Sequence, residues 1–544
     1  MQQTCEKCSS NFEITDTEEK QYSKWDFPLP TECPDCRFQL RLATRNELTL
    51  YSRRCDMAKD QIVAMYSQDA PFPVYSQKAW WGDYWNGDDY AQDFDFSKPF
   101  FEQWHELFLK TPKIPVFNQT SENSDYCNNS VDNKDCYLCM SVVNCQDCLY
   151  TTRCFKNKDI VSCFDVYKSE ICYASINIIE SYGIFFSSYI KNCSDMFHCS
   201  DCVGCQSCIG CTNLRNKNFC IFNKEVGQEE YKRVLNEVLS SAKALEELRR
   251  EVGQLRSNQI IRAIHIQKSE NCSGDFIDNS KNCKHCFYVK ESEDCAYLNF
   301  ASKLTDSIDS DFTDSTPLSL HCMAIEQCYE PIFSYLCVNS TTVFYSNLAV
   351  GCKNCFGCSS LKKMNYCILN KQYSENEYEN MMTRIVEHMK KTGEWGKFFP
   401  AKYSPFCYNE TVAMEHYPLS KEQALQKGYR WKEKDPKEYR PQTCQVPENI
   451  QDVEDSIINE ILACKKCGRN FKIIPKELKF YKRYKLPIPR KCPDCRHAEL
   501  LELRNPRKFF ERNCKKCSKK IKTTLPQSRP EVVYCEDCYL KEIY

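Results

Sequence analysis

Residues 205–231 read CQSCIGCTNLRNKNFCIFNKEVGQEEY, and residues 352–378 repeat this segment as CKNCFGCSSLKKMNYCILNKQYSENEY. The two copies align without a gap at a spacing of 147 residues. Each copy ends a cysteine-rich stretch and leads into a segment of helical composition. Duplication on this scale indicates a repeat architecture, in which two related arms are each followed by a helix.

Within the first arm the cysteines recur every nine residues. The positions are Cys127, Cys136, Cys145, Cys154, Cys163 and Cys172, and then Cys193, Cys202, Cys211 and Cys220. A period of nine matches neither a helical face nor one long strand. It fits a parallel β-solenoid of about 18 to 20 residues per rung, with one short strand in each half-turn. We therefore expect a mainly β, multidomain protein with two cysteine-rich parallel β-solenoid arms.

The two ends of the chain are one module written twice, 459 residues apart. The N-terminal copy reads CEKC-x24-CPDC-x18-Cys55, and the C-terminal copy reads CKKC-x24-CPDC-x18-CKKC-x17-CEDC. Paired Cys-x-x-Cys turns supply the four thiolates that structural zinc prefers, in zinc-ribbon or treble-clef fingers. We predict about three Zn²⁺ per chain. The predicted ligands are Cys5, Cys8, Cys33 and Cys36, then Cys464, Cys467, Cys492 and Cys495, then Cys514, Cys517, Cys535 and Cys538.

The second finger of the N-terminal module has lost three ligands. Its four ligand positions hold Cys55, Ala58, Ser76 and Ala79. A lone thiolate cannot hold zinc. We expect this finger to persist by packing, helped by the aromatic residues between Trp80 and Trp85.

Composition limits the classes of protein to which the chain can belong. The chain has 544 residues, 42% of them hydrophobic and 27% charged, which predicts several globular domains. The N-terminus lacks the features of a signal peptide, and no apolar stretch is long enough to span a membrane. The 41 cysteines therefore favour metal sites and buried thiols in a reducing, cytoplasmic environment over disulfides.

The C-terminal module is locally basic, although the formal net charge of the chain is -1. Between Cys464 and Pro530 roughly twenty Lys and Arg residues face about five Asp and Glu. Aromatic residues are interleaved with them, and this pattern is typical of modules that bind RNA or single-stranded DNA. A solvated charged face explains the pattern equally well. The candidate nucleic-acid contacts are Lys482, Arg483, Lys485, Arg507, Lys508, Arg512, Lys515, Lys516, Lys519 and Lys520.

An enzymatic function is a further alternative. The run Cys199, Cys202, Cys205, Cys208 and Cys211 has spacings seen in iron-sulfur proteins, which allows a metal- or thiol-dependent redox enzyme or transferase. Buried thiol ladders inside a solenoid explain the same cysteines. The chain has no phosphate-binding glycine loop, nucleophile elbow or His-Glu-x-x-His motif. The leading hypothesis is a non-enzymatic scaffold or interaction protein with structural zinc.

The expected domain order follows from these features. Residues 228–258 read as one long helix with a short coiled-coil seam, through which the chain could form a homodimer with a second copy. The expected segments are a tandem finger module (1–90), a linker with a helix (91–120), arm 1 (121–227), a long helix (228–264), arm 2 (265–372), a helix (373–400), a linker (401–460) and a basic tandem finger module (461–544).

Several motifs together resemble a known family. They are CPDCR with Leu-Pro-x-Pro upstream at residues 486–489, Arg-Asn downstream, and the closing Cys-x-x-Cys-Ile-Gly-Cys or Cys-x-x-Cys-Phe-Gly-Cys. The chain is similar along nearly its whole length to a family of cysteine-rich bacterial proteins with duplicated CxxC…CPxCR zinc modules. Members sometimes carry the label of a carnitine/bile-acid-type CoA-transferase, which the glycine-poor, cysteine-rich centre of this chain does not support. The resemblance implies no activity, and the degenerate second finger departs from the family pattern.

Overall fold

The computed structural model of the protein describes residues 1–433 and 438–543. The chain forms two compact units, each made of two segments that are distant in sequence. Unit 1 comprises Met1–Val116 and Ile264–Glu433, and unit 2 comprises Phe117–Ala263 and Lys434–Tyr544. Each unit therefore combines one terminal module with one arm, and the N-terminal module belongs with arm 2. The fold is mainly β with several parallel sheets, as expected.

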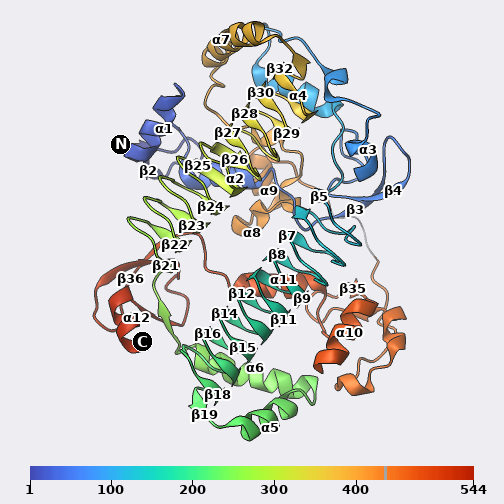
Figure 1. Ribbon diagram of the computed structural model, residues 1–544, viewed down its shortest axis with the longest axis vertical. Coiled ribbons are helices and arrows are strands. Elements are labelled where there is room, and N and C mark those ends of the chain that lie inside the picture. Colours follow the sequence, from blue (N-terminus) through green and yellow to red (C-terminus); the bar gives the residue numbers. More distant parts are fainter. Residues whose placement is uncertain (434–437, 544) are drawn as a thin grey trace. The chain divides into compact units, whose positions relative to one another are not determined.

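Arm 1 is built from short strands, which begin every six residues between Thr152 and Gln206 (Figure 1). The strands are β5 (Asn118–Gln119), β6 (Ser130–Val131), β7 (Met140–Val143), β8 (Thr152–Phe155), β9 (Lys158–Val161), β10 (Phe164–Tyr167), β11 (Glu170–Tyr173), β12 (Ile176–Ile179), β13 (Tyr182–Phe185), β14 (Ser188–Lys191), β15 (Ser194–Phe197), β16 (Ser200–Val203), β17 (Gln206–Ile209), β18 (Asn218–Ile221) and β19 (Lys224–Glu225). From β8 to β17, alternate strands belong to an eight-stranded and a seven-stranded sheet. Cys154 in β8 pairs in parallel with Val166 in β10, twelve residues later.

Arm 2 has the same twelve-residue parallel register, but most of its strands belong to one eleven-stranded sheet and two others form a two-stranded sheet. Its strands are β21 (Ile266–Gln267), β22 (Gly274–Asp278), β23 (Cys286–Lys290), β24 (Asn299–Ser302), β25 (Ile308–Asp314), β26 (Leu320–Met323), β27 (Tyr329–Ile332), β28 (Thr341–Phe344), β29 (Asn347–Val350), β30 (Lys353–Phe356), β31 (Ser359–Lys362), β32 (Asn365–Ile368) and β33 (Lys371–Gln372). Val289 pairs with Ala301 and Cys355 pairs with Cys367, again twelve residues apart. In both arms the final short strand, β19 or β33, turns back antiparallel.

The repeat is shorter than the sequence spacing predicts. Residues at every third position are buried, as in the run Cys148, Thr151, Cys154, Asn157 and Ile160. The residue before each of these positions adopts a positive φ, so the backbone bends every three residues. Four such steps complete the twelve-residue register. The expected rung of about 18 to 20 residues was wrong. Cysteines occupy only a subset of the buried positions, which recur every three residues, so the nine-residue spacing of the cysteines is a multiple of that three-residue spacing and not half of a rung.

The buried positions select small side chains that both donate and accept hydrogen bonds. The Ser175 hydroxyl donates to the carbonyl of Tyr173 at 2.8 Å and accepts from the N–H of Ser187 at 3.0 Å. The Cys199 thiol donates to Phe197 O at 3.5 Å and accepts from Cys211 N–H at 3.4 Å. Serine and cysteine therefore have the same role at these buried positions, since both form hydrogen bonds with backbone groups that are shielded from water.

The segment after arm 1 forms two helices and not the single long helix that we predicted. α5 (Gln228–Val238) ends at Leu239, and α6 (Ala242–Arg256) begins after Ser241, whose side chain accepts from the N–H of Ala244. This N-cap interrupts the helix and satisfies the new helix end. Val238, Leu248 and Val252, three residues of the predicted seam, are buried in the core of unit 2.

The helix after arm 2 and the helix before arm 1 lie in unit 1. α4 (Phe100–Lys110) and α7 (Glu375–Thr392) both contribute to an aromatic-rich core with residues of arm 2. The expected linker contains α8 (Ala413–His416) and α9 (Lys421–Gln426), and α9 begins at the predicted capping box of Ser420 and Gln423. Residues 434–437 of that linker lie outside the described residues.

Candidate metal centres

The three predicted cysteine tetrads each converge on one point. In each group the four sulfur atoms lie within 4.8 Å of one another. The Cys8 and Cys33 sulfurs are 3.7 Å apart, and the Cys467–Cys492 and Cys517–Cys535 distances are 3.8 Å. A tetrahedron with metal–sulfur bonds of about 2.3 Å has sulfur–sulfur edges of about 3.8 Å. The spacing of the thiols is therefore that of a tetrahedral four-thiolate site.

A hairpin and a helix start position each tetrad. The elements are β1 (Gln2–Thr4), β2 (Asn11–Glu13) and α2 (Pro34–Leu42) for the first site, β34 (Leu462–Ala463), β35 (Asn470–Phe471) and α11 (Pro493–Glu502) for the second, and β36 (Phe510–Asn513), β37 (Lys520–Thr523), β38 (Val532–Tyr534) and α12 (Glu536–Ile543) for the third. The first Cys-x-x-Cys pair follows the first strand of the hairpin. The second pair lies in the first turn of the helix, where Cys33 and Cys492 are N-caps and proline follows at N1.

Hydrogen bonds lower the pKa of one cysteine in each site. Cys33 N–H donates to Cys5 Sγ at 3.2 Å, although burial still raises the pKa of Cys5. Side-chain hydrogen bonding from Cys36 is the main cause that lowers the pKa of Cys33 to about 5. At Cys464 and Cys514 burial acts to raise the pKa, but hydrogen bonds from backbone N–H groups outweigh it and lower the pKa to about 6. Thiolates are the form that binds metal.

The degenerate finger keeps the shape of a metal site without the ligands. Its hairpin is β3 (Tyr51–Arg54) and β4 (Gln61–Ala64), and its helix is α3 (Gln77–Trp81). The sulfur of Cys55 accepts the N–H groups of Ala58 and Ser76 at 3.2 and 3.1 Å. Ser76 occupies a ligand position and acts as the N-cap of α3 by accepting from the N–H of Ala79.

A carboxylate links the two halves of this finger. Asp56 accepts the N–H of Val74 at 2.7 Å and forms an ion pair with Arg53 at 2.8 Å. The corresponding residue of the C-terminal module, 459 positions later, is Lys515, which offers no carboxylate. The packing that we expected contributes as well, since Trp80 and Trp85 are buried, whereas Trp81 and Tyr84 are partly or largely exposed.

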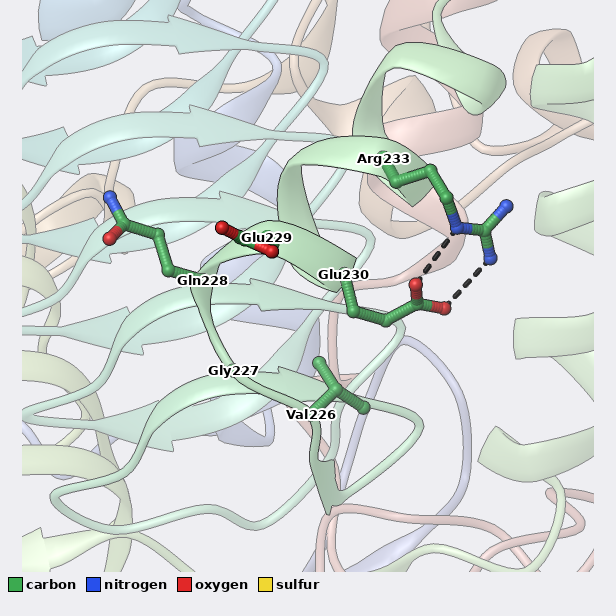
Figure 2. A pocket seen from close by; sticks show the side chains of 6 residues that line it. All are labelled: Val226, Gly227, Gln228, Glu229, Glu230 and Arg233. Carbon is green, nitrogen blue, oxygen red and sulfur yellow. Dashed lines mark hydrogen bonds and ion pairs between the residues drawn. The ribbon is translucent and has the colours of Figure 1, made fainter.

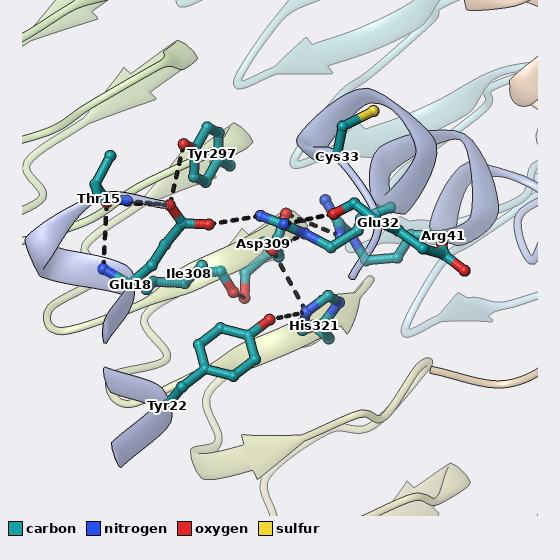
Figure 3. A network of polar contacts seen from close by, with 12 residues as sticks. Thr15, Glu18, Tyr22, Glu32, Cys33, Arg41, Tyr297, Ile308, Asp309 and His321 are labelled. Atoms are coloured by element: carbon teal, nitrogen blue, oxygen red, sulfur yellow. Dashed lines mark hydrogen bonds and ion pairs between the residues drawn. The ribbon is translucent and has the colours of Figure 1, made fainter. Parts of the chain in front are cut away.

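A buried polar network joins the N-terminal module to arm 2 (Figure 3). In it Arg37 donates to Glu18 at 2.9 Å and to Asp309 at 2.7 Å, and the Tyr297 hydroxyl donates to Glu18 at 3.2 Å. All of these side chains are buried. The opposite charge of Arg37 holds the pKa of Asp309 below its ordinary value against the effect of burial. Because Glu18 and Arg37 belong to the module, and Asp309 and Tyr297 belong to arm 2, the network couples the module to the arm.

Next to this network His321 is neutral. Burial lowers its pKa to about 3 although Asp309 lies 3.4 Å away. Its ring is hydrogen bonded to the Tyr22 hydroxyl, as Figure 3 shows. The sequence alone could not identify this histidine, because it is isolated in the chain and its hydrogen-bond partner Tyr22 is 299 residues away.

The same contact recurs between the C-terminal module and arm 1. Arg496 donates to Glu477 at 3.0 Å, and the Tyr150 hydroxyl donates to Glu477 at 3.2 Å. Arg496 and Glu477 lie 459 positions after Arg37 and Glu18, and Tyr150 lies 147 positions before Tyr297. Both duplications in the sequence therefore meet in one duplicated interface, which appears once in each unit.

The basic residues that we singled out as nucleic-acid contacts divide into two groups. Lys482 pairs with Asp455, Arg483 lies 3.7 Å from Asp159 of arm 1, and Lys516 pairs with Glu542. Arg512 donates to backbone carbonyls, and Arg507 is partly buried. The remaining five are exposed lysines, namely Lys485, Lys508, Lys515, Lys519 and Lys520.

The arm cysteines do not form a comparable cluster. Within residues 1–433 and 438–543 the groups of converging ligand atoms are the three tetrads, and the run Cys199 to Cys211 is not among them. All five cysteines of that run are buried in the apolar core of arm 1. Burial raises the pKa of Cys199, whereas hydrogen bonds from neighbouring thiols lower the pKa of Cys205 to about 3 and that of Cys211 to about 4. The arrangement is that of a thiol ladder, which the sequence admitted as an alternative.

The start of α5 forms a pocket (Figure 2). It is lined by Val226, Gly227, Gln228, Glu229, Glu230 and Arg233. Its one basic side chain is already neutralised, since Arg233 forms a two-point ion pair with Glu230 at 2.8 and 2.7 Å. The pocket therefore presents no free charge of opposite sign to an anionic ligand.

Comparisons with known proteins do not place the chain in a family. No family model matches it, and no curated protein matches it. A solved structure described as an acetyltransferase from Desulfovibrio desulfuricans G20 shares 9% identity over 50% of this chain and 81% of that chain, with a TM-score of 0.11. A likeness this weak carries no argument about fold or activity. Among the described helices, none is both long and apolar enough to cross a membrane.

Proposed function

We propose that the protein is a zinc-binding scaffold in which Zn²⁺ at the three tetrads has a structural role. The observation that carries this proposal is the sulfur–sulfur spacing of 3.7 to 3.8 Å, which matches the edges of a tetrahedral zinc–thiolate site. The hairpin followed by a helix start supports treble-clef-like fingers. Four cysteine ligands leave no open position for a substrate or water, which is typical of structural and not of catalytic zinc.

The arms support the scaffold part of the proposal. A twelve-residue parallel register with a bend every three residues is the pattern of a β-solenoid, and we propose that fold for both arms. Solenoids present long rigid faces for binding partners. The metal sites would then fix the modules that are docked on those arms through the Glu18 and Glu477 contacts.

Metal analysis of matched variants tests the proposal. The purified full-length protein should contain about three Zn²⁺ per chain, and Cys5→Ser should remove about one of them. Cys55→Ser is the control, because Cys55 lies in the degenerate finger and its loss should leave the metal content unchanged. Iron with acid-labile sulfide, or a wild-type chain without zinc, would overturn the proposal.

A second candidate is binding of single-stranded nucleic acid by the third finger. Lys515, Lys519 and Lys520 are exposed around this site, and none of them has an ion-pair partner in the part of the chain that the structure describes. Phosphate contacts release counterions, so affinity should fall steeply with salt. The variant K515E/K519E/K520E should lose binding to a labelled oligonucleotide, whereas K482E, whose lysine is already paired, should lose less. Binding that is insensitive to salt would exclude this function.

A further inference from the structure

The two copies of the module–arm interface differ at one set of positions. In unit 1 Arg41 is fully buried and contacts Asp311 at 2.6 Å and Asp309 at 3.0 Å. The corresponding residue of the C-terminal module, 459 positions later, is Leu500. In unit 2 Leu500 packs against Phe164 and Ile176 in an apolar cluster. An ionic contact in one unit thus stands where the other unit has a hydrophobic contact.

The arm residues that face this position also differ between the two units. Asp309 and Asp311 of arm 2 correspond to Ser162 and Phe164 of arm 1, which lie 147 positions earlier. Asp309 and Ser162 share the same backbone conformation, with φ of 53° and 51°. The charged version is completed by Asn299, which donates to Asp311 at 2.8 Å. The ionic set is therefore held by contacts within unit 1, although Nη2 of Arg41 has no hydrogen-bond partner among the described residues. The apolar set packs within unit 2.

We infer that this difference is a pairing code, in which arm 2 accepts a module with arginine at this position and arm 1 accepts a module with leucine. The wrong pairing would bury Arg41 against Phe164 and Ser162, which stand where arm 2 has Asp311 and Asp309. It would also bury Asp311 against Leu500 without the cation that lies 2.6 Å from it in unit 1, whereas Asp309 would still meet Arg496, the counterpart of Arg37. A buried unpaired charge is strongly unfavourable, so each module rejects the arm of the other unit.

The contacts that the two interfaces share do not distinguish one arm from the other. The contacts Arg37–Glu18–Tyr297 and Arg496–Glu477–Tyr150 are the same in both units, so they attract either module to either arm. Discrimination must come from positions that differ. Selectivity through unpaired buried charge in the wrong complex is an established physical device.

Two ion pairs report native pairing in the full-length chain. Lys390, which follows arm 2, lies 2.6 Å from Asp26 of the N-terminal module, and Lys476 of the C-terminal module lies 2.8 Å from Asp135 of arm 1. A carbodiimide joins a lysine to a carboxylate only at contact distance. Cross-link yields at these two pairs, measured by mass spectrometry, therefore quantify native pairing in each unit.

The first variant makes both interfaces apolar. It carries Arg41→Leu, Asp309→Ser and Asp311→Phe, which copies the version already present in unit 2. We expect its unfolding midpoint to stay near that of the wild type, while both cross-link yields fall to roughly half, because two pairings of equal energy are populated equally. Unchanged yields would overturn the inference, and so would a collapsed midpoint, since the apolar set would then not be interchangeable.

The second variant exchanges the code between the units. It adds Leu500→Arg, Ser162→Asp and Phe164→Asp to the first variant, so that each module again matches only its native arm. We expect both cross-link yields to return to the wild-type values. Yields that stay low would show that these positions do not carry the code and would overturn the inference. Arg41→Lys alone is a control that keeps the charge and should keep both cross-links.

Discussion

The guanidinium of Arg41 lies 2.6 Å from the carboxylate of Asp311, and neither side chain is exposed to solvent. Burial opposes the charge on both residues, and burial is the largest influence on the pKa of each. Such a pair is held by the neighbouring polar groups as much as by its own attraction. The chain itself contains the hydrophobic alternative, in Leu500 and Phe164 of unit 2.

Breaking this pair from one side should be costly. Arg41→Leu leaves Asp311 buried without its cation, while Asp309 keeps its contact with Arg37. We expect a loss of about 3 to 5 kcal/mol in the free energy of unfolding. Urea denaturation measures it. Arg54→Leu is the control, because Arg54 is exposed and its substitution should cost less than about 0.5 kcal/mol. A small effect of Arg41→Leu would mean that water reaches this site.

Lys113 is buried, and no carboxylate among the residues that the structure describes forms an ion pair with it. Its ammonium position contacts the Thr111 hydroxyl at 2.6 Å, the Ser359 hydroxyl at 3.0 Å and the ring of Phe108 at 4.0 Å. Burial lowers its pKa well below the ordinary value of 10.5. Between the lowered pKa and 10.5 the unfolded chain binds more protons at this site than the folded one, so its contribution to stability rises with pH in that range.

Lys113→Met should therefore stabilise unit 1 at neutral pH by about 1 to 4 kcal/mol and remove this part of the alkaline pH dependence. Denaturation at several pH values, compared with the wild type, measures both effects. Lys110→Met is the matched control, because Lys110 ends α4 only three residues before Lys113 but is exposed. Destabilisation by Lys113→Met would show that the hydrogen bonds of the amine outweigh the cost of burying it.

The buried arm thiols should be inert in the folded protein because alkylating reagents do not reach them, even Cys205 and Cys211, whose pKa values neighbouring thiols lower. Burial raises the pKa of Cys163 to about 12 and that of Cys172 well above its ordinary value. Only the thiolate reacts with iodoacetamide. In metal-loaded protein, we expect alkylation mainly at the partly exposed cysteines outside the tetrads, Cys272, Cys407 and Cys444. Mass spectrometry identifies the sites, and rapid labelling of the buried arm cysteines before unfolding would contradict the ladder arrangement.

Asp56 should connect the two halves of the degenerate finger, as a metal ion would connect them in an intact finger. Asp56→Asn weakens its ion pair with Arg53 and its hydrogen bond from Val74, and we expect a loss of about 1 to 3 kcal/mol in the stability of unit 1. Asp60→Asn is the control, because Asp60 is exposed and contributes its backbone carbonyl, which the substitution leaves unchanged. Equal effects of the two substitutions would rule out this role.

The cysteine tetrads were predictable because each depends on local geometry. A Cys-x-x-Cys turn brings two sulfurs together within four residues, and the proline after Cys33 and Cys492 marks the helix start that supplies the other two. The helix break at Ser241 was missed, although serine is a strong N-cap, because the apolar spacing continued across it. The period of the arms was also missed, since cysteine, serine and valine share the buried positions and only the cysteines were counted.

The sequence by itself determined the modules, the two duplications, the three converging tetrads and the mainly β character, because these follow from contacts within short segments and from composition. Only the tertiary structure decided that the N-terminal module docks on arm 2 and the C-terminal module on arm 1. That choice rests on side chains such as Arg41 and Asp309, which are 268 positions apart and meet only when their charges are buried together. Neither residue reveals its partner in the sequence, since the energy that selects the pairing exists only after water has been excluded from both.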